Sequence, residues 1–137
     1  HPYDDELVIA GQGTIGLEIL DQLPDLDAVI VPVGGGGLIS GVAFAIKSLR
    51  PEIKVYGVQA EGAPSMYRSL HEHKYQTLKA VSTFADGIQV KTPGELTYQI
   101  CEPEAGGRGR RCSAGGGCPV PQAAHRGQKG GVRRLRR

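Results

Sequence analysis

The strongest constraint on the fold is a strand, a glycine cluster, a helix and a second strand that follow one another along the chain. The run DAVIVPV, Asp27 to Val33, is short, apolar and rich in β-branched residues, as expected of a strand buried on both faces. The cluster GGGG follows, and a helical pattern then runs from Leu38 to Arg50 and stops at Pro51. The run KVYGVQA, Lys54 to Ala60, predicts another strand. This order predicts a βαβ unit with parallel strands.

Helical patterns flank this unit on both sides. Before it, apolar residues recur at helical spacing over residues 15–23, with Thr14 as the candidate N-cap. After it, residues 63–75 and 93–100 also have helical patterns. The sequence therefore predicts an α/β domain over residues 1–100, in which a parallel sheet has flanking helices.

The stretch GQGTIG, Gly11 to Gly16, matches the dinucleotide-binding pattern G-x-G-x-x-G. Such a loop follows a strand, opens a helix and is followed about 20 residues later by a carboxylate that binds the ribose. Only the short run LVIA precedes this stretch, and the next strand ends at Val33 without a carboxylate. The context argues against an NAD site. We interpret these glycines as shaping a tight turn and allowing close helix packing.

The cluster GGGG, Gly34 to Gly37, has the surroundings of a phosphate site. It lies at the carboxyl end of a predicted buried strand, where ligands of parallel α/β sheets bind. Glycines let the backbone approach a ligand closely, and their N–H groups can converge on an anion at the N-terminus of the helix beginning near Leu38. The loop lacks the GK[ST] ending of a nucleotide-triphosphate loop. A small phosphate monoester is the favoured ligand, and a merely flexible turn is the alternative.

The charge of the chain divides into two parts. Residues 1–100 hold 7 Lys/Arg against 12 Asp/Glu, whereas residues 101–137 hold 9 against 2. The second part also has nine glycines in 37 residues and almost no apolar periodicity, which predicts a disordered or atypical tail. Its composition is also what an out-of-frame reading of a GC-rich gene gives. A basic Gly/Arg tail could bind nucleic acid nonspecifically, but this function is disfavoured because no aromatic residue follows Tyr98.

Four stretches together resemble one enzyme family. They are VIAGQGTIGLEIL, VIVPVGGGGLISG, VYGVQAE and ADGIQVKTPGELTYQI, which cover nearly all of residues 1–100. In order and spacing they are similar to the threonine ammonia-lyases (threonine dehydratases) and to the related serine racemases and serine dehydratases. These are pyridoxal-phosphate enzymes of fold type II, the tryptophan-synthase-β-like group.

The resemblance implies roles for particular residues. In the family the glycine-rich loop binds the cofactor phosphate through backbone amides, which assigns that role to Gly34, Gly35, Gly36, Gly37 and the amide of Leu38. It also places Gly87 beside the cofactor ring, and we interpret Asp86 as structural. Family members often bind a divalent or monovalent cation, and the matching positions are Glu61 and the carbonyl of Ser65. Tyr67 stands where metal-binding relatives have a further acid, so a solvated or hydrogen-bonded Glu61 is the favoured interpretation.

The lysine that binds the cofactor covalently in the family lies in a Ser-x-Lys-x-Arg-like motif. None of the lysines of residues 1–100 lies in such a motif, so we assign no catalytic residue. We expect an internal fragment that loses the family pattern after Ile100 and has no turnover of its own. The resemblance implies that the complete enzyme converts threonine to 2-oxobutyrate and ammonia, as in isoleucine biosynthesis, with serine racemase or a related enzyme as the alternative.

The sequence also indicates where such an enzyme acts. No apolar run approaches the roughly 20 residues of a membrane-spanning helix, and the acidic start HPYDDE does not resemble a secretory signal. We therefore expect a cytoplasmic protein with no membrane partner. Its substrate is expected to be a small amino acid, and the resemblance implies a homo-oligomer for the full-length enzyme.

Overall fold

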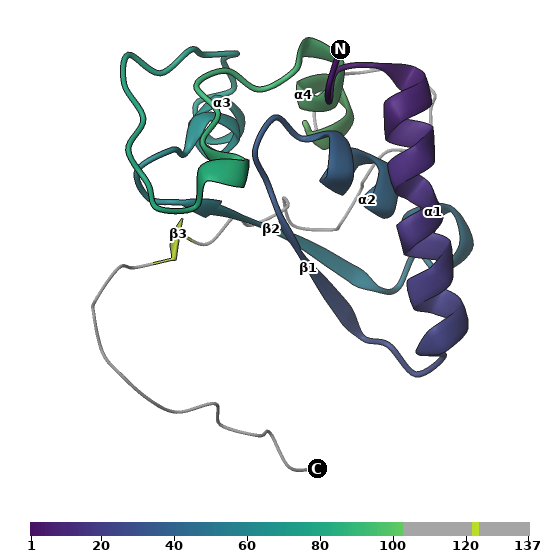
Figure 1. The fold of residues 1–137 in the computed structure, drawn as a ribbon. Helices are drawn as coiled ribbons and strands as arrows, with labels where there is room; N and C mark the ends of the chain where they lie inside the picture. The colour runs from purple at the N-terminus through teal and green to yellow at the C-terminus, as the bar shows by residue number, and fades with distance from the viewer. Residues whose placement is uncertain (103–121, 124–137) are drawn as a thin grey trace.

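A computed structural model describes residues 1–102 and 122–123 of the chain (Figure 1). Three parallel strands form a small sheet in the order β1-β2-β3, and helices flank it. The elements in chain order are α1 (Glu6–Gln22), β1 (Ala28–Pro32), α2 (Gly37–Leu49), β2 (Lys54–Ala60), α3 (Ser65–His71), the 3₁₀ turn η1 (Asp86–Ile88), α4 (Glu95–Cys101) and β3 (Gln122–Ala123). The predicted α/β class with a parallel sheet and flanking helices is confirmed.

The unit β1-α2-β2 is the βαβ unit that the sequence predicts. Strands β1 and β2 pair in parallel from Ala28 opposite Lys54 to Pro32 opposite Val58. One further bond from the Val33 N–H to the Val58 carbonyl, 2.8 Å long, extends the pairing to the residue before the glycines. The glycine cluster therefore leaves the sheet at the carboxyl ends of two adjacent strands.

The sheet is less buried than its sequence predicts. Val31 is 4% exposed and packs in the core, but its neighbour Ile30 is 68% exposed. Side chains of adjacent strand residues point to opposite faces, so only one face of β1 contributes to the core. The prediction of a strand buried on both faces is wrong for the described part of the chain. The core on the covered face consists of Val31, Val33, Ile39, Val42, Ala43, Ile46, Ile53, Val55, Met66, Tyr98 and Cys101.

Helix α1 begins earlier than the sequence predicts. Asp5 is its N-cap, and the Asp5 Oδ1 atom accepts hydrogen bonds from the N–H groups of Leu7 (2.9 Å) and Val8 (3.2 Å). Thr14 is therefore not a cap but lies within the helix, where its hydroxyl donates to the Gly11 carbonyl at 2.8 Å. The run LVIA, which alone can be strand or helix, belongs to the first turns of α1.

The GQGTIG stretch consequently lies inside a helix and forms no tight turn, which corrects that part of its interpretation. The other part, close helix packing, agrees with the structure. A Cβ atom on Gly16 would lie 3.0 Å from the Val42 carbonyl oxygen, and one on Gly41 would lie 2.2 Å from the Ile9 carbonyl oxygen. Helices α1 and α2 thus lie side by side with their backbones close together, as Figure 1 shows.

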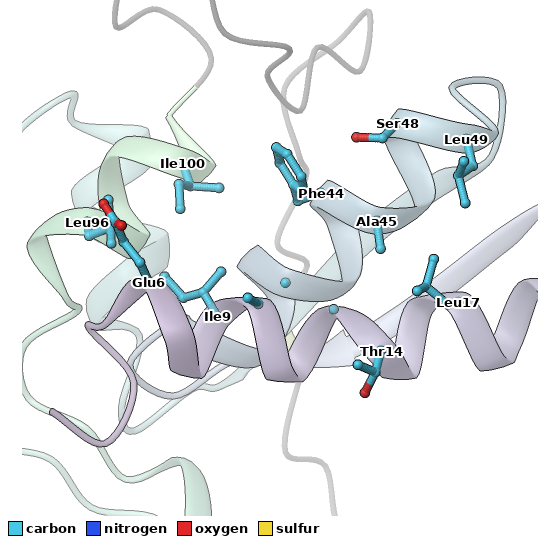
Figure 2. A pocket seen from close by; sticks show the side chains of 13 residues that line it. Glu6, Ile9, Thr14, Leu17, Phe44, Ala45, Ser48, Leu49, Leu96 and Ile100 are labelled. Atoms are coloured by element: carbon cyan, nitrogen blue, oxygen red, sulfur yellow. The ribbon is translucent and has the colours of Figure 1, made fainter.

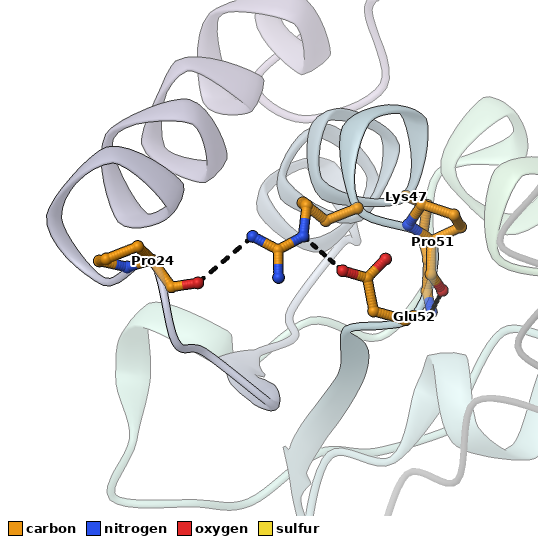
Figure 3. A network of polar contacts seen from close by, with 5 residues as sticks. Pro24, Lys47, Pro51 and Glu52 are labelled. Carbon is orange, nitrogen blue, oxygen red and sulfur yellow. Dashed lines mark hydrogen bonds and ion pairs between the residues drawn. The ribbon is translucent and has the colours of Figure 1, made fainter.

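Polar contacts join the end of α2 to its neighbours (Figure 3). Arg50 is the C-cap of α2, and its guanidinium donates to the Pro24 carbonyl at 3.3 Å and pairs with the Glu52 carboxylate. The Lys47 ammonium donates to the Pro51 carbonyl at 2.9 Å. The Arg50 side chain also lowers the pKa of Glu52. These contacts link the loop after α1 to the turn before β2.

The later helices are short. Helix α3 ends at His71, so the predicted segment 63–75 is helical only in its middle. Helix α4 begins at Glu95, with Gly94 as its N-cap, close to the predicted start at Pro93. No helix in the described ranges is long and apolar enough to cross a membrane. Apart from Glu102 and the segments Cys101 and Gln122–Ala123, the predicted Gly/Arg-rich tail, with the frame and nucleic-acid interpretations attached to it, lies outside the described residues.

Candidate functional site

The glycine loop connects β1 to α2 through a left-handed residue. Gly36 has φ 104° and is the N-cap of α2. Its carbonyl accepts the first helical hydrogen bond, from the Ser40 N–H at 3.0 Å. Left-handed backbone at this position favours glycine because a side chain there is strained. The glycine cluster therefore forms a left-handed turn that directs the chain into α2.

The predicted cofactor residues line one cavity of about 350 Å³. These residues are Gly34, Gly35, Gly36, Gly37, Leu38 and Gly87. Tyr3, Gln12 and Val90 are among the other lining residues, and no lining residue in the described part of the chain carries a charged side chain. An anion in this cavity would consequently depend on backbone dipoles and on the N-terminus of α2.

The two sides of the glycine loop differ in their hydrogen bonds. The N–H groups of residues 34–38 donate no hydrogen bond to any described residue. The carbonyls of the same turn have partners: Gln59 Nε2 donates to Val33 (3.2 Å) and Gly34 (3.4 Å), while the Gly94 N–H (3.0 Å) and Thr97 Oγ1 (2.6 Å) donate to Gly35. A row of unpaired N–H groups at a helix N-terminus is an arrangement that binds anions.

Tyr3 covers part of this loop, and its sequence position gave no signal of that role. A Cβ atom on Gly35 would lie 2.2 Å from Tyr3 Cδ2, and one on Gly37 would lie 2.9 Å from the Tyr3 carbonyl oxygen. The Tyr3 hydroxyl donates to the Thr92 carbonyl at 3.1 Å. Burial, followed by the nearby Asp4 carboxylate, raises the pKa of Tyr3. The glycines thus allow the Tyr3 ring to lie against the loop.

Gln59 and Thr97 are further site residues that the sequence interpretation missed. Gln59 is 3% exposed and Thr97 is fully buried. A polar residue at a buried strand position, as Gln59 is in β2, is a signal that could have identified it, because buried polar groups need partners. Thr97 offers no such signal, since its contact with Gly35 joins residues 62 positions apart.

Gly87 and Asp86 lie opposite the glycine loop in η1. A Cβ atom on Gly34 would lie 3.6 Å from the Gly87 carbonyl oxygen, so the two segments are in contact. A Cβ atom on Gly87 itself would meet nothing within 4 Å. Asp86 Oδ1 accepts a hydrogen bond from the Gly87 N–H at 2.8 Å, which fits the structural role given to Asp86.

The candidate cation residues lie in the turn after β2 and at the start of α3. Glu61 is exposed in the turn after β2, whereas Ser65 is buried at the start of α3. The Ser65 carbonyl already accepts a hydrogen bond from Ser69 Oγ at 2.8 Å. The Tyr67 ring stacks on the His71 ring. Within the described ranges no group of three or more His, Cys, Asp or Glu residues could hold a metal ion, and the cation site stays a prediction.

A larger groove lies between α1 and α2 (Figure 2). Its volume is about 670 Å³, and Ile9, Phe44 and Ile100 are among the side chains around it. Among the described residues that line it, Glu6 alone is charged. The described residues around the groove supply no cationic side chain. They also supply no loop N–H groups like those that line the smaller cavity. Its chemistry does not suit a phosphate, so the smaller cavity is the better candidate despite its size.

Comparison with known proteins adds the decisive observation. The family model described as "Pyridoxal-phosphate dependent enzyme" matches residues 1–114, which is most of the chain. The chain belongs to this family. The resemblance inferred from the glycine loop and its neighbouring stretches is thereby confirmed, and the cofactor of the family is the expected pyridoxal phosphate.

Relatives in the family include enzymes that act on threonine. The L-threonine ammonia-lyase of Thermotoga maritima is 59% identical over 100 residues, which cover 73% of this chain and 25% of the relative. The catabolic L-threonine dehydratase TdcB of Escherichia coli K12 is 58% identical over 99 residues, covering 72% of this chain and 30% of the relative. The chain thus spans about a quarter to a third of the length of these relatives.

Solved structures of the family share the fold. Threonine deaminase isoform 2 of Solanum lycopersicum matches with a TM-score of 0.72 at 53% identity, over 74% of this chain and 29% of that one. Maize serine racemase matches with a TM-score of 0.70 at 42% identity, over 73% of this chain and 31% of that one. These similarities confirm the fold class expected from the sequence.

Proposed function

We propose that this chain is a segment of a pyridoxal-phosphate-dependent threonine ammonia-lyase and that its glycine loop holds the cofactor phosphate. The observation that carries the proposal is the row of N–H groups from Gly34 to Leu38, which donate to no described residue and line a cavity at the N-terminus of α2. The same cavity contains Gly87, the other residue that the family resemblance places beside the cofactor.

The residues fit a phosphate monoester through hydrogen bonding alone. Backbone N–H groups donate charge-assisted hydrogen bonds to phosphate oxygens, and the dipole of α2 adds a favourable potential. Gly87 lines the cavity, and a Cβ atom there would meet no other atom within 4 Å. The bound cofactor supplies an electron sink that makes removal of the α-proton of an amino acid feasible. The role proposed for this chain is to bind and orient the phosphate end of the cofactor.

Threonine is the substrate that the relatives favour. Both relatives described above are named for threonine, and they are more similar in sequence to this chain than the serine racemase structure is. The proposed reaction is the dehydration and deamination of threonine to 2-oxobutyrate and ammonia. The role is either catabolic, as for the enzyme of Escherichia coli, or isoleucine biosynthesis. We place the complete enzyme in the cytoplasm as a homo-oligomer.

Serine racemization is the second candidate. It is favoured by the structural similarity to maize serine racemase, which covers 73% of this chain. The glycine loop and Gly87 suit either reaction, because each uses the same cofactor phosphate. A complete enzyme that converts L-serine to D-serine faster than it releases ammonia from threonine would favour this candidate.

The test of the proposed cofactor site compares pyridoxal phosphate with pyridoxal, which lacks the phosphate. Binding of each compound to the chain is measured by equilibrium dialysis. We expect pyridoxal phosphate to bind at least about tenfold more tightly, because several charge-assisted hydrogen bonds depend on the phosphate. Equal affinity for the two compounds would remove the glycine loop from the phosphate site.

A further inference from the structure

We propose that Gln59 and Thr97 are positioning residues that turn the N–H groups of the glycine loop toward the cavity, and that Asp4 supports Thr97. This inference rests on the proposed phosphate site. It concerns the carbonyl oxygens of the loop, which accept hydrogen bonds from three residues distant in sequence: Gln59, Gly94 and Thr97.

Peptide planarity connects the carbonyl side of the loop with its N–H side. In a trans peptide the C=O of one residue and the N–H of the next point in opposite directions. Gln59 Nε2 lies 3.2 Å from the Val33 oxygen and 3.4 Å from the Gly34 oxygen. These contacts therefore orient the N–H groups of Gly34 and Gly35 to the other side. Gln59 is itself held, because its Oε1 atom accepts the Tyr67 N–H at 2.8 Å.

Thr97 orients the next peptide of the loop in the same way. Its hydroxyl lies 2.6 Å from the Gly35 oxygen and 3.1 Å from the Gly94 oxygen, and the shorter contact identifies Gly35 as the main acceptor. The Gly94 N–H also donates to the Gly35 oxygen, at 3.0 Å. With two donors on the Gly35 carbonyl, the Gly36 N–H is fixed on the cavity side.

Asp4 holds the helix turn that carries Thr97. The N-cap of α4 is Gly94, which has no side chain to accept the first N–H groups of the helix. Asp4 takes that place: its carboxylate accepts from the N–H groups of Glu95 (3.0 Å), Leu96 (2.9 Å) and Thr97 (3.2 Å). A Cβ atom on Gly94 would lie 2.2 Å from Asp4 Oδ1, so glycine is what allows this approach.

A glycine loop needs such hydrogen bonds to keep its peptide groups in one orientation. Glycine populates positive and negative φ about equally, so a peptide between glycines can rotate without a Cβ clash. A rotated Gly35–Gly36 peptide would turn a carbonyl oxygen toward the phosphate and an N–H group away from it. The hydrogen bonds that the Gly94 N–H and the Thr97 hydroxyl donate to the Gly35 carbonyl disfavour that rotation, because it would leave the buried Gly94 N–H unpaired.

The test uses Thr97→Val in the whole chain, with Thr97→Ser as the rescue and Thr14→Val as the matched control. Valine has nearly the shape of threonine but no hydroxyl, whereas serine keeps the donor. Thr14 donates only to a carbonyl of its own helix. Affinity for pyridoxal phosphate and for inorganic phosphate is measured for each variant, together with the circular dichroism of the chain and hydrogen exchange at the Gly36 amide.

We expect Thr97→Val to weaken binding of both phosphate compounds by about fivefold or more, as loss of one hydrogen bond implies. Affinity for pyridoxal, which has no phosphate, should not change. Thr97→Ser should restore binding, and Thr14→Val should leave it unchanged. Faster hydrogen exchange at the Gly36 amide should accompany the loss of affinity.

Three outcomes overturn the inference, each in a different way. If the unaltered chain binds pyridoxal phosphate and a folded Thr97→Val variant binds it equally well, Thr97 does not position the loop, and the proposed cofactor site stands. If the unaltered chain binds neither phosphate compound, the cofactor site fails and the inference fails with it. Should Thr97→Val not fold, Asp4→Ala replaces it, and normal phosphate affinity in the folded Asp4→Ala variant also overturns the inference.

Discussion

Gly36 is the residue whose backbone depends most clearly on the absence of a side chain. Its φ is 104°, and a Cβ atom there would lie 2.6 Å from Met66 Cε and 2.8 Å from Thr97 Cβ. We predict that Gly36→Ala lowers the free energy of unfolding by about 1–3 kcal/mol through backbone strain, with the steric contacts adding to this loss. Urea denaturation followed by circular dichroism measures the change.

Gly11 provides the control for that substitution. It lies within α1, and a Cβ atom there would meet nothing within 4 Å. Alanine is the better helix former, so Gly11→Ala should raise the free energy of unfolding by up to about 1 kcal/mol. Equal stability of the Gly36→Ala and Gly11→Ala variants would contradict the left-handed geometry of the loop.

Substitution of Gly87 should affect cofactor binding but hardly affect stability. Its φ is not in the left-handed region, and a Cβ atom would enter open space. We predict that Gly87→Ala changes the free energy of unfolding by less than about 0.5 kcal/mol, as for an unencumbered site. Its affinity for pyridoxal phosphate should fall about fivefold or more, because the added methyl group takes space needed by the cofactor. Unchanged affinity would place the cofactor ring elsewhere.

At the scale of elements, α4 joins the site to the core through Tyr98. The Tyr98 side chain is 9% exposed, and its hydroxyl donates to Glu102 Oε1 at 2.6 Å. Burial, followed by the hydrogen bond to Glu102 and its charge, raises the pKa of Tyr98 to about 12. Since this value lies above that of an unfolded tyrosine, Tyr98 stabilises the fold below pH about 10, and the contribution is lost as pH rises through about 12.

The variant Tyr98→Phe tests this pH dependence. Near neutral pH the free energy of unfolding of this variant should be about 1 kcal/mol lower than that of the unaltered chain, since one hydrogen bond is lost. The difference between the two proteins should shrink between pH about 10 and 12, the range set by the unfolded and folded pKa values. Denaturation curves at several pH values measure it. A difference that stays constant over this range would show that Tyr98 ionises at an ordinary pKa.

The sequence predicts some elements well and others poorly, for identifiable reasons. The unit β1-α2-β2 and its glycine loop follow from local patterns, and the structure confirms them. The start of α1 does not, because a four-residue apolar run fits strand or helix equally and Asp5 decides the outcome. The contacts of Asp4 and Thr97 were not predictable either. They join residues 91 and 62 positions apart, and spacing within one segment carries no information about them.

At the scale of the whole molecule, the described part of the chain corresponds to one part of a larger enzyme fold, and several of its large apolar side chains are exposed. The chain spans 25% and 30% of the two relatives compared above, and Leu49, Phe44 and Ile30 are each more than half exposed. The cofactor cavity is lined mainly by glycine and apolar residues, with Gln12 and Tyr3 as polar members, and no described lining residue is a lysine. We therefore expect binding determinants without the group that binds the cofactor covalently.

This expectation predicts the behaviour of the chain in an activity assay. With added pyridoxal phosphate and threonine, the chain alone should release no ammonia above the level of free cofactor, because no lysine of residues 1–100 has the family motif. Ammonia release is followed with a coupled enzyme assay, and a complete relative provides the positive control. Sustained cofactor-dependent release by the chain itself would contradict the absence of a catalytic lysine.

The most direct test of the central claim is a ¹⁵N–¹H NMR titration of the chain with pyridoxal phosphate. We predict that the amide signals of Gly34 to Leu38 shift most, that Gly87 shifts with them, and that inorganic phosphate reproduces the shifts of the loop alone. The largest shifts at residues around the groove between α1 and α2, with the loop amides unmoved, would contradict the assignment of the phosphate to the glycine loop.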